Sequence, residues 1–327
     1  MRILAVTNSY PTAEKPFQGT FIRSQVKGLR EVGVDVTVLF IDRVKAGRAA
    51  YAALPKLLRE EIGKAKPDAV HTMYGGIMAA IVARSIDLPH IVSFCGSDLL
   101  GEVYRNPLKI LTTQIGIKAS HYSAKKSAAV IVKSLNLRRA LPSSIPQEKI
   151  HTIPNGIDLE QFRPLDSMAC RRRLGWDPSK FHLLFSGSSD LEIKGLGLAK
   201  RTLHELAALG VECEFHILRS VAHEDVPLWL NASNAFLLTS SHEGSPNIVK
   251  EAIACGTPIV SVDVGDVRER IRGIDGCSIV RADAKALALQ IQAISRLGDF
   301  RADGFETIRP MSIQNIGRRI LDVYRSV

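Results

Sequence analysis

The sequence predicts an α/β fold made of two doubly wound parallel sheets, each in its own domain, that face each other across a cleft. Three observations support this prediction. Strand-like and helix-like patterns alternate along the 327 residues, their connections are short, and a turn-rich break near the middle is followed by a second series of the same kind. A chain of this length is too long for one ordinary core and suits two domains of about 150 residues each.

The N-terminal half opens the alternation. Its first strand has an apolar part too short for a signal peptide, so we expect it to be the first strand of a sheet. The expected strands are 3–6, 34–41, 68–72, 90–94, 129–132 and 150–153, and the expected helices are 20–32, 51–65, 76–85, 109–126 and 135–141.

A break follows the strand at 150–153. Residues 154–158 read Pro-Asn-Gly-Ile-Asp and are rich in turn formers, and residues 162–164 continue as an extended link. We therefore predict an N-terminal domain over 1–164, a second domain over 165–310, and a C-terminal helix within 311–327 that could pack back on the N-terminal domain.

The second half repeats the alternation. A helix should begin at Lys194-Gly195, and another should begin within the segment 243–251. The further expected strands are 181–185, 213–218, 236–239 and 257–262, and the further expected helices are 226–232, 266–272, 284–297 and 313–324.

Composition excludes several classes of protein. Hydrophobic residues make up 46% of the chain and charged residues 23%, as in globular proteins, and no apolar run reaches the roughly 20 residues that span a bilayer. The five cysteines form neither a metal-binding nor a disulfide pattern, which fits a reducing cytoplasm. They stand at 95, 170, 213, 255 and 277.

The positive charge is confined to one half of the chain. Residues 1–163 hold 23 Lys and Arg against 13 Asp and Glu, whereas residues 164–327 hold 20 of each. A basic half suggests an anionic partner, such as a membrane surface, an acidic acceptor or nucleic acid, although it could also be a solubilising surface. Aromatic residues are only 6% and do not alternate with basic ones, so we expect no nucleic acid partner.

Glycine-bearing turns follow several of the predicted strands. Ligands of open α/β sheets bind beyond the carboxyl ends of the strands, and glycine permits the close backbone approach that a phosphate cradle requires. Five such turns, divided between two similar domains, predict a cleft in which each domain binds one ligand. They contain Gln18-Gly19, Cys95-Gly96-Ser97-Asp98, Gly187-Ser188-Ser189, Glu243-Gly244-Ser245 and Val264-Gly265-Asp266.

The segment Glu243–Glu251 carries the strongest local argument. It lies between a short apolar strand and a helix, with Ser245 as the expected N-cap and Pro246 as the first helical residue. Backbone N–H groups at such a helix start, together with the helix dipole, attract phosphate. Lys194 is the obvious additional cation. The alternatives are a capped helix with two solvated glutamates and an exposed helical lysine.

Some motifs are missing from the sequence. No Gly-x-Gly-x-x-Gly follows the first strand, no Walker lysine motif occurs, and no Asp-x-Asp pair could clamp a divalent metal. We therefore expect no metal and no cofactor. A bound diphosphate would be neutralised by protein cations and helix ends.

The order of these motifs resembles the GT-B glycosyltransferases, specifically the large retaining family 4. The glutamate pair Glu243 and Glu251, the loop from Gly187 to Lys194-Gly195, the segment 153–158, and the loop 11–29 with Gly19 match that family over essentially the whole chain. The sequences of residues 17–21 and 244–247 are most similar to those of enzymes of bacterial cell-surface polysaccharide synthesis, including the teichuronic acid type.

The resemblance implies a function and roles. The chain would move a sugar from a nucleotide-sugar, with a UDP- or GDP-sugar expected, to a glycan or lipid-linked acceptor, as a cytoplasmic enzyme peripheral on the inner face of the cell membrane. Glu251 would hold the ribose, Glu243 would face the transferred sugar, and Lys194 would assist in catalysis. The donor would also contact Gly187, Ser188, Gly244, Ser245, Pro246, Asn247 and Ile248, and the acceptor side would be lined by Gly19, Cys95, Gly96, Ser97 and Asp98.

The sequence departs from the family at three places. Ser188 stands where an arginine is usual, Cys95 stands where a histidine is common, and the short stretch 218–226 suggests a trimmed second domain. The backbone N–H of Gly96 is therefore the expected donor at that turn. Two other functions stay open, a nucleotide-sugar epimerase of GT-B fold and a catalytically weak sugar-nucleotide-binding protein.

Overall fold

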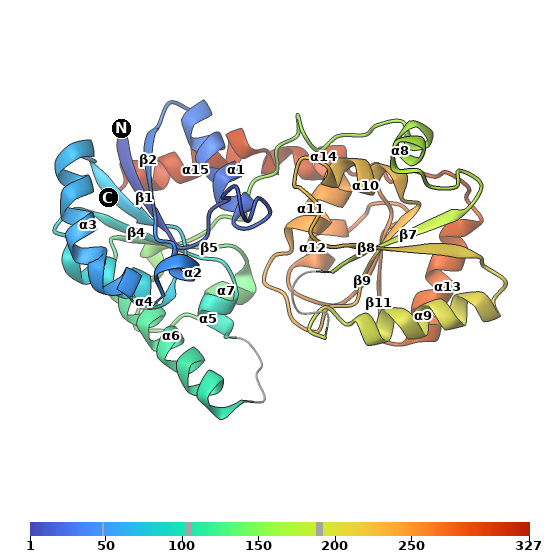
Figure 1. The fold of residues 1–327 in the computed structure, drawn as a ribbon, viewed down its shortest axis with the longest axis horizontal. Helices are drawn as coiled ribbons and strands as arrows, with labels where there is room; N and C mark the ends of the chain where they lie inside the picture. Colours follow the sequence, from blue (N-terminus) through green and yellow to red (C-terminus); the bar gives the residue numbers. More distant parts are fainter. Residues whose placement is uncertain (48, 102–105, 188–191) are drawn as a thin grey trace. The chain divides into compact units, whose positions relative to one another are not determined.

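The computed structural model divides the chain into two compact units (Figure 1). The first unit comprises Met1–Gly156 together with Ile313–Val327, and the second comprises Ile157–Ser312. The structure describes all residues except 48, 102–105 and 188–191. Each unit has its own parallel sheet and its own hydrophobic core.

The first unit alternates strands and helices, as its sequence predicts. The strands are β1 Arg2–Thr7, β2 Asp35–Phe40, β3 Ala69–Thr72, β4 His90–Phe94, β5 Ala129–Val132 and β6 Ile150–Thr152. The helices are α1 Thr20–Glu31, α2 Arg43–Ala46, α3 Ala49–Ala65, α4 Gly76–Ser85, α5 Ser97–Leu100, α6 Pro107–Lys126, α7 Leu135–Arg139, the 3-10 turn η1 Gln147–Lys149, and α15 Ile313–Arg325.

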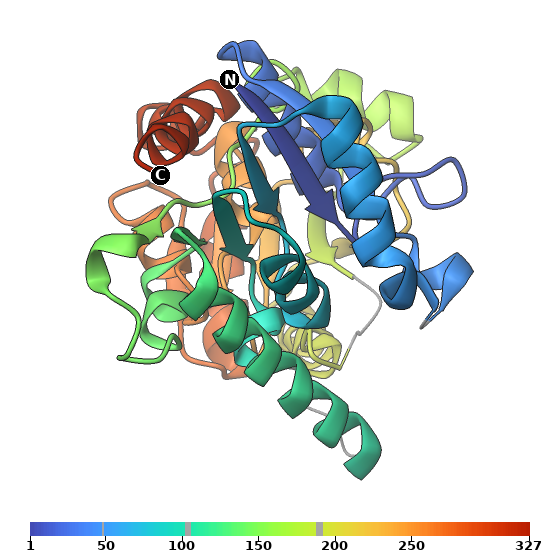
Figure 2. The ribbon, with the colours of Figure 1, turned by 90° about the vertical axis from the view of Figure 1, so that its left-hand side faces the viewer.

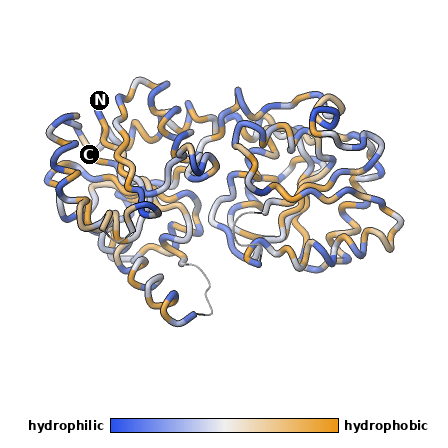
Figure 3. The backbone as a smooth tube through the Cα atoms, viewed as in Figure 1, coloured by the Kyte–Doolittle hydropathy of each residue, from blue (hydrophilic) through white to orange (hydrophobic). Residues whose placement is uncertain are grey.

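The sheet of the first unit is parallel, with strand order β2-β1-β3-β4-β5-β6. Successive residues of β1 point to opposite faces: Ile3 and Ala5 pack towards α1 and α15, whereas Leu4 and Val6 pack towards α3 and α4. Because both faces are covered, the strands are mainly apolar, and they are coloured mainly orange in Figure 3.

Helix α15 returns to the first unit after the chain has built the second. It lies against α1 and buries Ile316, Ile320 and Tyr324 in the same core as β1 (Figure 2). The backbones of the two helices approach closely, because a Cβ on Gly317 would lie 2.6 Å from the carbonyl oxygen of Gly28. The last helix is therefore an integral part of the first unit's core.

The second unit has the same architecture with five strands. They are β7 Phe181–Ser186, β8 Cys213–Leu218, β9 Ala235–Leu238, β10 Ile259–Val262 and β11 Ser278–Val280. The helices are α8 Ser167–Leu174, α9 Leu196–Ala208, α10 Val226–Ala232, α11 Asn247–Ala254, α12 Val267–Ile271, α13 Ala284–Ser295, α14 Phe305–Ile308 and the 3-10 turn η2 Arg309–Met311.

The strand order of the second sheet is β11-β10-β9-β7-β8, and all its pairs are parallel. The chain begins at β7, moves outward to the edge strand β8 and then crosses to β9. One face packs on α9 and α13 and the other on α10, α11 and α12. The order of the strands reverses between β7 and β9, which is where open α/β sheets bind ligands.

The structure differs from the sequence prediction in several elements. The division between units falls at Gly156–Ile157 rather than at 164–165, because Ile157 and Phe162 are buried in the core of the second unit. Helix α8, whose buried face includes Arg171, the three-residue strand β11, and the four-residue helices α2, α5 and α14 were not predicted from the sequence. No element intervenes between β8 and α10, where the prediction also placed none.

Candidate functional site

The second unit places its glycine-bearing turns side by side at the switch point of the sheet. Gly187 follows β7, the turn Glu243-Gly244-Ser245 follows β9, and these two strands are neighbours. We call the residues that gather here the second-unit site, namely Gly187, Lys194, His223, Glu243–Glu251 and Asp266.

Lys194 and Glu243 are brought together although they are far apart in the sequence. The Nζ atom of Lys194 lies 2.6 Å from Oε1 of Glu243, and both side chains are largely buried. Hydrogen bonds from Thr239 fix the loop, because its hydroxyl donates to the carbonyls of Lys194 at 3.0 Å and Gly195 at 2.9 Å. The ammonium group is thereby held over the carboxyl end of β9.

Gly195 permits this close approach. Its φ is 76°, and a Cβ there would overlap with the carbonyl oxygen of Thr239. Only glycine meets both conditions without strain. The position of Lys194 therefore depends on the residue that follows it.

The start of α11 differs from its prediction. The N-cap is Pro246 rather than Ser245, and the helix begins at Asn247 without a side-chain cap. The Ser245 hydroxyl instead donates to Oδ2 of Asp266 at 2.9 Å. The expectation that Ser245 caps the helix is wrong, because the helix begins one residue later than predicted and Ser245 therefore precedes its N-cap.

A charged network supports the turn from beneath. Asp266 also accepts from Nε of Arg270 at 2.8 Å, and the fully buried Lys250 donates to the Ser245 hydroxyl at 3.4 Å. The other carboxylate oxygen of Asp266, Oδ1, is buried and has no hydrogen-bond partner in the part of the chain that the structure describes. Such an oxygen is an acceptor for a ligand hydroxyl or for water. The sequence analysis assigned no role to Lys250 or Arg270.

Glu251 lies in the next turn of α11 and faces a histidine. Its Oε1 is 3.3 Å from Nε2 of His223, and both side chains are about one-tenth exposed. Gln161 holds the histidine by donating to its carbonyl at 2.7 Å, and the Phe162 ring packs on the imidazole. His223 lies in the loop between β8 and α10, and no sequence pattern marks it.

The remaining predicted residues of this unit surround the same turn. Gly244 and Pro246 are buried, and Asn247 and Ile248 form the first turn of α11 half-buried. The N–H of Gly187 donates to the carbonyl of Leu218 at 3.1 Å, so this hydrogen bond extends the pairing of β7 with β8. Ser188 lies outside the described residues.

In the first unit, the turn Cys95–Asp98 folds back on itself. The Asp98 carboxylate accepts from the backbone N–H of Gly75 at 2.9 Å, of Cys95 at 3.0 Å and of Gly96 at 2.7 Å. The expectation that the Gly96 N–H meets a ligand is wrong, because Asp98 already accepts its hydrogen bond. Burial raises the pKa of Asp98, and these three bonds oppose the rise.

Lys133 lies buried near this turn and escaped the sequence analysis. Its Nζ donates to Oε1 of Gln25 at 3.1 Å. Burial lowers the pKa of Lys133, while the nearby Cys95 and Asp98 raise it. Gly19 is also structural, since its φ is 68° and a Cβ there would overlap with the backbone of Ser9.

A pocket of about 880 Å³ opens at the carboxyl ends of β1, β3 and β4 in the first unit. Of the predicted acceptor-side residues it includes Ser97 and Asp98, whereas Gly19, Cys95 and Gly96 are not among its lining residues. Its wall combines hydroxyl groups and two cationic side chains with one apolar flank, provided by Tyr51, Tyr74, Arg43, Lys109, Ile115 and Ile117.

Both halves of the chain match known families. Residues 18–161 match the family described as Glycosyltransferase Family 4, and residues 171–296 match Glycosyl transferases group 1. D-inositol 3-phosphate glycosyltransferase 1 of Catenulispora acidiphila is 27% identical over 79% of this chain and 72% of its own. TuaC of Bacillus subtilis, named as a teichuronic acid biosynthesis glycosyltransferase, is 24% identical over 90% of this chain and 89% of its own.

Solved structures share the fold. Sucrose-phosphate synthase from Thermosynechococcus elongatus superposes with a TM-score of 0.81 at 16% identity, covering 100% of this chain and 99% of that one. Anabaena Alr3699/HepE in complex with UDP and glucose gives 0.72 at 16% identity, with both chains covered completely. UDP-GlcNAc 2-epimerase from Methanocaldococcus jannaschii gives 0.62 at 11% identity over both complete chains.

None of the helices among the described residues is both long enough and apolar enough to cross a membrane.

Proposed function

Since the chain belongs to the GT-B glycosyltransferases of family 4, we propose that it transfers a sugar from a nucleotide-diphosphate sugar to a glycan or lipid-linked acceptor. We further propose that transfer proceeds with retention and without a metal ion in the reaction, and that it serves cell-surface polysaccharide synthesis. The relative named for teichuronic acid biosynthesis supports this class of acceptor.

One observation carries the proposal, namely the ammonium of Lys194 held beside Glu243 at the uncapped start of α11. A diphosphate is dianionic, and the developing charge on this leaving group is what an enzyme of this kind must stabilise. Lys194 supplies a full positive charge, and the start of α11 supplies the positive end of a helix dipole. Both would act on the same phosphate groups.

The remaining roles follow from position. Glu243 would face the transferred sugar, and the buried Oδ1 of Asp266 would accept a hydroxyl hydrogen bond from the same ligand. Glu251 would hold the ribose hydroxyls, with His223 orienting its carboxylate from 3.3 Å. In this arrangement one carboxylate serves each end of the donor, and the phosphates lie between them.

The pocket of the first unit supports the acceptor side of the proposal. Arg43 and Lys109 are cations that suit a phosphate on the acceptor, and Tyr51 and Tyr74 offer hydroxyl groups to sugar hydroxyls. The apolar flank at Ile115 and Ile117 suits a lipid segment.

A thermal-shift screen over UDP-, GDP-, ADP- and dTDP-sugars tests donor binding. A donor at a hundred times its dissociation constant stabilises the folded chain by about 2.7 kcal/mol. We expect one nucleotide class to raise the melting temperature of the wild type, and the Lys194→Met variant to lose the effect. Lys200→Met replaces an exposed lysine on α9 and is the matched control. Absence of any shift in the wild type would contradict the proposal.

Transfer itself is tested with the Glu251→Ala variant. Loss of the ribose contact should abolish transfer while the circular dichroism spectrum is unchanged. Full activity in this variant would contradict the assignment. A new sugar nucleotide formed without acceptor would indicate an epimerase. Tight donor binding without turnover over a broad acceptor panel would indicate a binding protein.

Metal independence has its own measurement. Turnover by the EDTA-treated, folded enzyme should not rise on addition of Mg²⁺ or Mn²⁺, because Lys194 and the start of α11 neutralise the diphosphate. Recovery of activity only with one of these ions would contradict this part of the proposal.

We also propose that the first unit binds an anionic membrane surface. Helix α6 exposes Leu108, Leu111 and Ile115 at 69%, 57% and 48%, and the same helix ends in the exposed Lys125 and Lys126. The apolar side chains lie in the first half of α6 and the two lysines at its end, so the helix offers both apolar and cationic groups to an interface with anionic lipid.

Vesicle cosedimentation tests this surface. The wild type should bind vesicles rich in anionic lipid at low salt and lose binding as salt rises. Replacing Lys125 and Lys126 by Glu should weaken binding, whereas replacing the exposed Lys200 of the second unit by Glu should not. Equal binding to neutral and anionic vesicles would contradict the electrostatic part of the proposal.

A further inference from the structure

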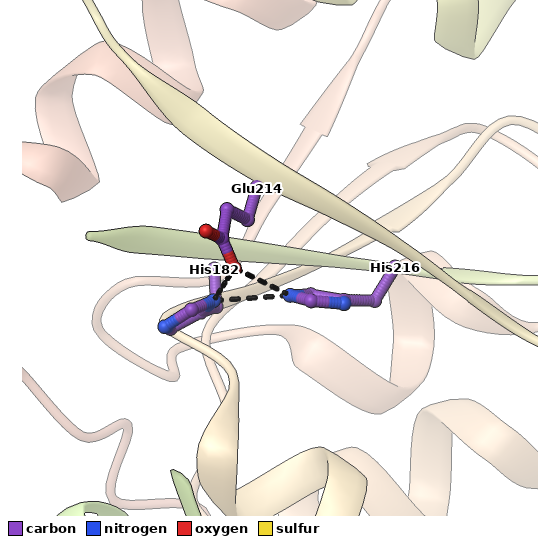
Figure 4. Close-up of side chains that lie close together, drawn as sticks. All are labelled: His182, Glu214 and His216. Carbon is purple, nitrogen blue, oxygen red and sulfur yellow. Dashed lines mark hydrogen bonds and ion pairs between the residues drawn. The ribbon is translucent and has the colours of Figure 1, made fainter. Parts of the chain in front are cut away.

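Three polar side chains meet on the edge of the second sheet, apart from the second-unit site. His182 comes from β7, and Glu214 and His216 come from β8 (Figure 4). His182 is the register partner of Glu214, and His216 follows two residues later on the same face of the strand. Sheet pairing therefore brings the three together.

The ligand-type atoms form a small triangle. Nδ1 of His182 lies 3.0 Å from Nε2 of His216 and 3.5 Å from Oε2 of Glu214, and the last two atoms are 3.9 Å apart. A tetrahedral Zn²⁺ with bonds of about 2.0–2.1 Å separates its ligand atoms by about 3.3–3.4 Å. The triangle thus has the size that one zinc ion requires.

The outer contacts of the cluster fix its orientation. Nε2 of His182 lies 2.7 Å from the backbone carbonyl of Asp177, so this nitrogen carries the proton and Nδ1 presents a lone pair to the cluster. The other carboxylate oxygen of Glu214 is 3.3 Å from Nζ of Lys180, and Trp176 stacks on the His216 ring at 3.5 Å. Hydrogen bonds and stacking contacts on the outer side of metal ligands orient them towards the ion.

The hydrogen bond between the two imidazoles is also compatible with a metal. Without a metal, Nε2–H of His216 can donate to Nδ1 of His182. Metal binding needs only the transfer of that proton to Nδ1 of His216, with no change in net charge.

We propose that His182, Glu214 and His216 form a binding site for a divalent transition metal, with Zn²⁺ the best match, that links the edge strand β8 to β7. Two histidines and one carboxylate are a common zinc ligand set, and water can complete the tetrahedron. The cluster lies towards the amino ends of its strands, whereas the second-unit site lies beyond their carboxyl ends. The ion would therefore stabilise the unit and take no part in sugar transfer.

The test measures zinc in the full-length chain. The purified protein is stripped with EDTA, desalted, supplied with one equivalent of ZnCl₂, passed through gel filtration and analysed for metal by mass spectrometry. We expect one zinc per chain, and a melting temperature raised by about 5 °C or more when free zinc greatly exceeds its dissociation constant. Substitution by Co²⁺ should give the visible absorption of a tetrahedral site.

Four variants make the assignment specific. Glu214→Gln alters a side chain that is one-third exposed and should fold, and His216→Gln removes a second ligand; both should lose the bound zinc and the thermal shift. His204→Gln replaces an exposed histidine on α9, and Cys213→Ser removes the thiol next to Glu214. Both of these variants should keep the bound zinc and the thermal shift. Wild-type protein that retains no zinc, or Glu214→Gln and His216→Gln variants that retain as much as the wild type, would overturn the proposal.

Discussion

His90 is buried between two hydroxyl groups, with Nε2 2.8 Å from Oγ1 of Thr72 and Nδ1 2.9 Å from Oγ of Ser127. Burial lowers the pKa of His90 from 6.5 to about 4. The folded chain thus keeps this imidazole neutral at pH values where the unfolded chain protonates it.

This difference predicts a loss of stability in acid. The contribution of His90 is complete above pH 6.5 and is lost as the pH falls towards 4, because the unfolded state then binds a proton that the folded state does not. The free energy of unfolding should decrease by roughly 3 kcal/mol over this window on account of this residue. Urea denaturation at several pH values measures the slope.

The control for this prediction is a pair of variants. His90→Gln should reduce the slope between pH 6.5 and 4, even if its stability at pH 7 is lower. His204→Gln changes an exposed histidine and should leave the slope as it is. An unchanged slope in His90→Gln would contradict the prediction.

At the scale of elements, the loop before α9 sets the position of the catalytic candidate Lys194. The loop is joined to the end of β9 by the Thr239 hydroxyl and by the N–H of Ser241, which donates to the carbonyl of Ile193 at 2.9 Å. Gly195 is the residue that lets the two backbones come this close.

Glycines at the two ends of α9 provide a matched comparison. Gly195→Ala adds a methyl group that overlaps with Thr239 and should cost about 3 kcal/mol or more, with a strong loss of donor binding. Gly210 has nearly the same φ, 74°, but no atom within 4 Å of a Cβ, so Gly210→Ala should cost only about 1 kcal/mol. Denaturation and the donor thermal shift measure both; equal effects of the two substitutions would refute the role given to Gly195.

At the scale of the whole molecule, the chain closes its first unit with its last helix. Ile320 of α15 is fully buried in the core shared with α1 and β1. Removing its side chain beyond Cβ leaves a cavity, so Ile320→Ala should destabilise the first unit by about 2–5 kcal/mol.

Hydrogen exchange distinguishes the two units in this variant. Amides of β1 and α1 should exchange faster in Ile320→Ala, whereas those of β9 and α11 should keep their wild-type rates, since they belong to the other core. Leu289→Ala changes an exposed side chain on α13 and should affect neither set. Faster exchange in β9, with unchanged exchange in β1 and α1, would contradict the claim that α15 stabilises the first unit.

The fold by itself does not decide the reaction. The chain superposes on a sucrose-phosphate synthase and also on a UDP-GlcNAc 2-epimerase, which perform different chemistry. The assignment to the transferases rests on the sequence matches over 18–161 and 171–296.

The sequence by itself determined the two α/β units, every described strand except β11, every described α-helix of more than four residues except α8, and the segments that carry Lys194, Glu243 and Glu251. These features follow from local periodicity and from the backbone freedom of glycine, both of which can be read within a few residues. It also indicated the family, because several motifs occur in one order along the chain.

Only the tertiary structure decided which side chains meet. Asp98 accepts the hydrogen bond of the Gly96 N–H that was expected to face a ligand, the Ser245 hydroxyl donates to Asp266, and His182 meets Glu214 and His216 across two strands. These contacts depend on strand order and register, which are set by the packing of the whole unit. A short window of sequence contains no record of them, since each joins residues whose proximity arises only when the sheet has formed.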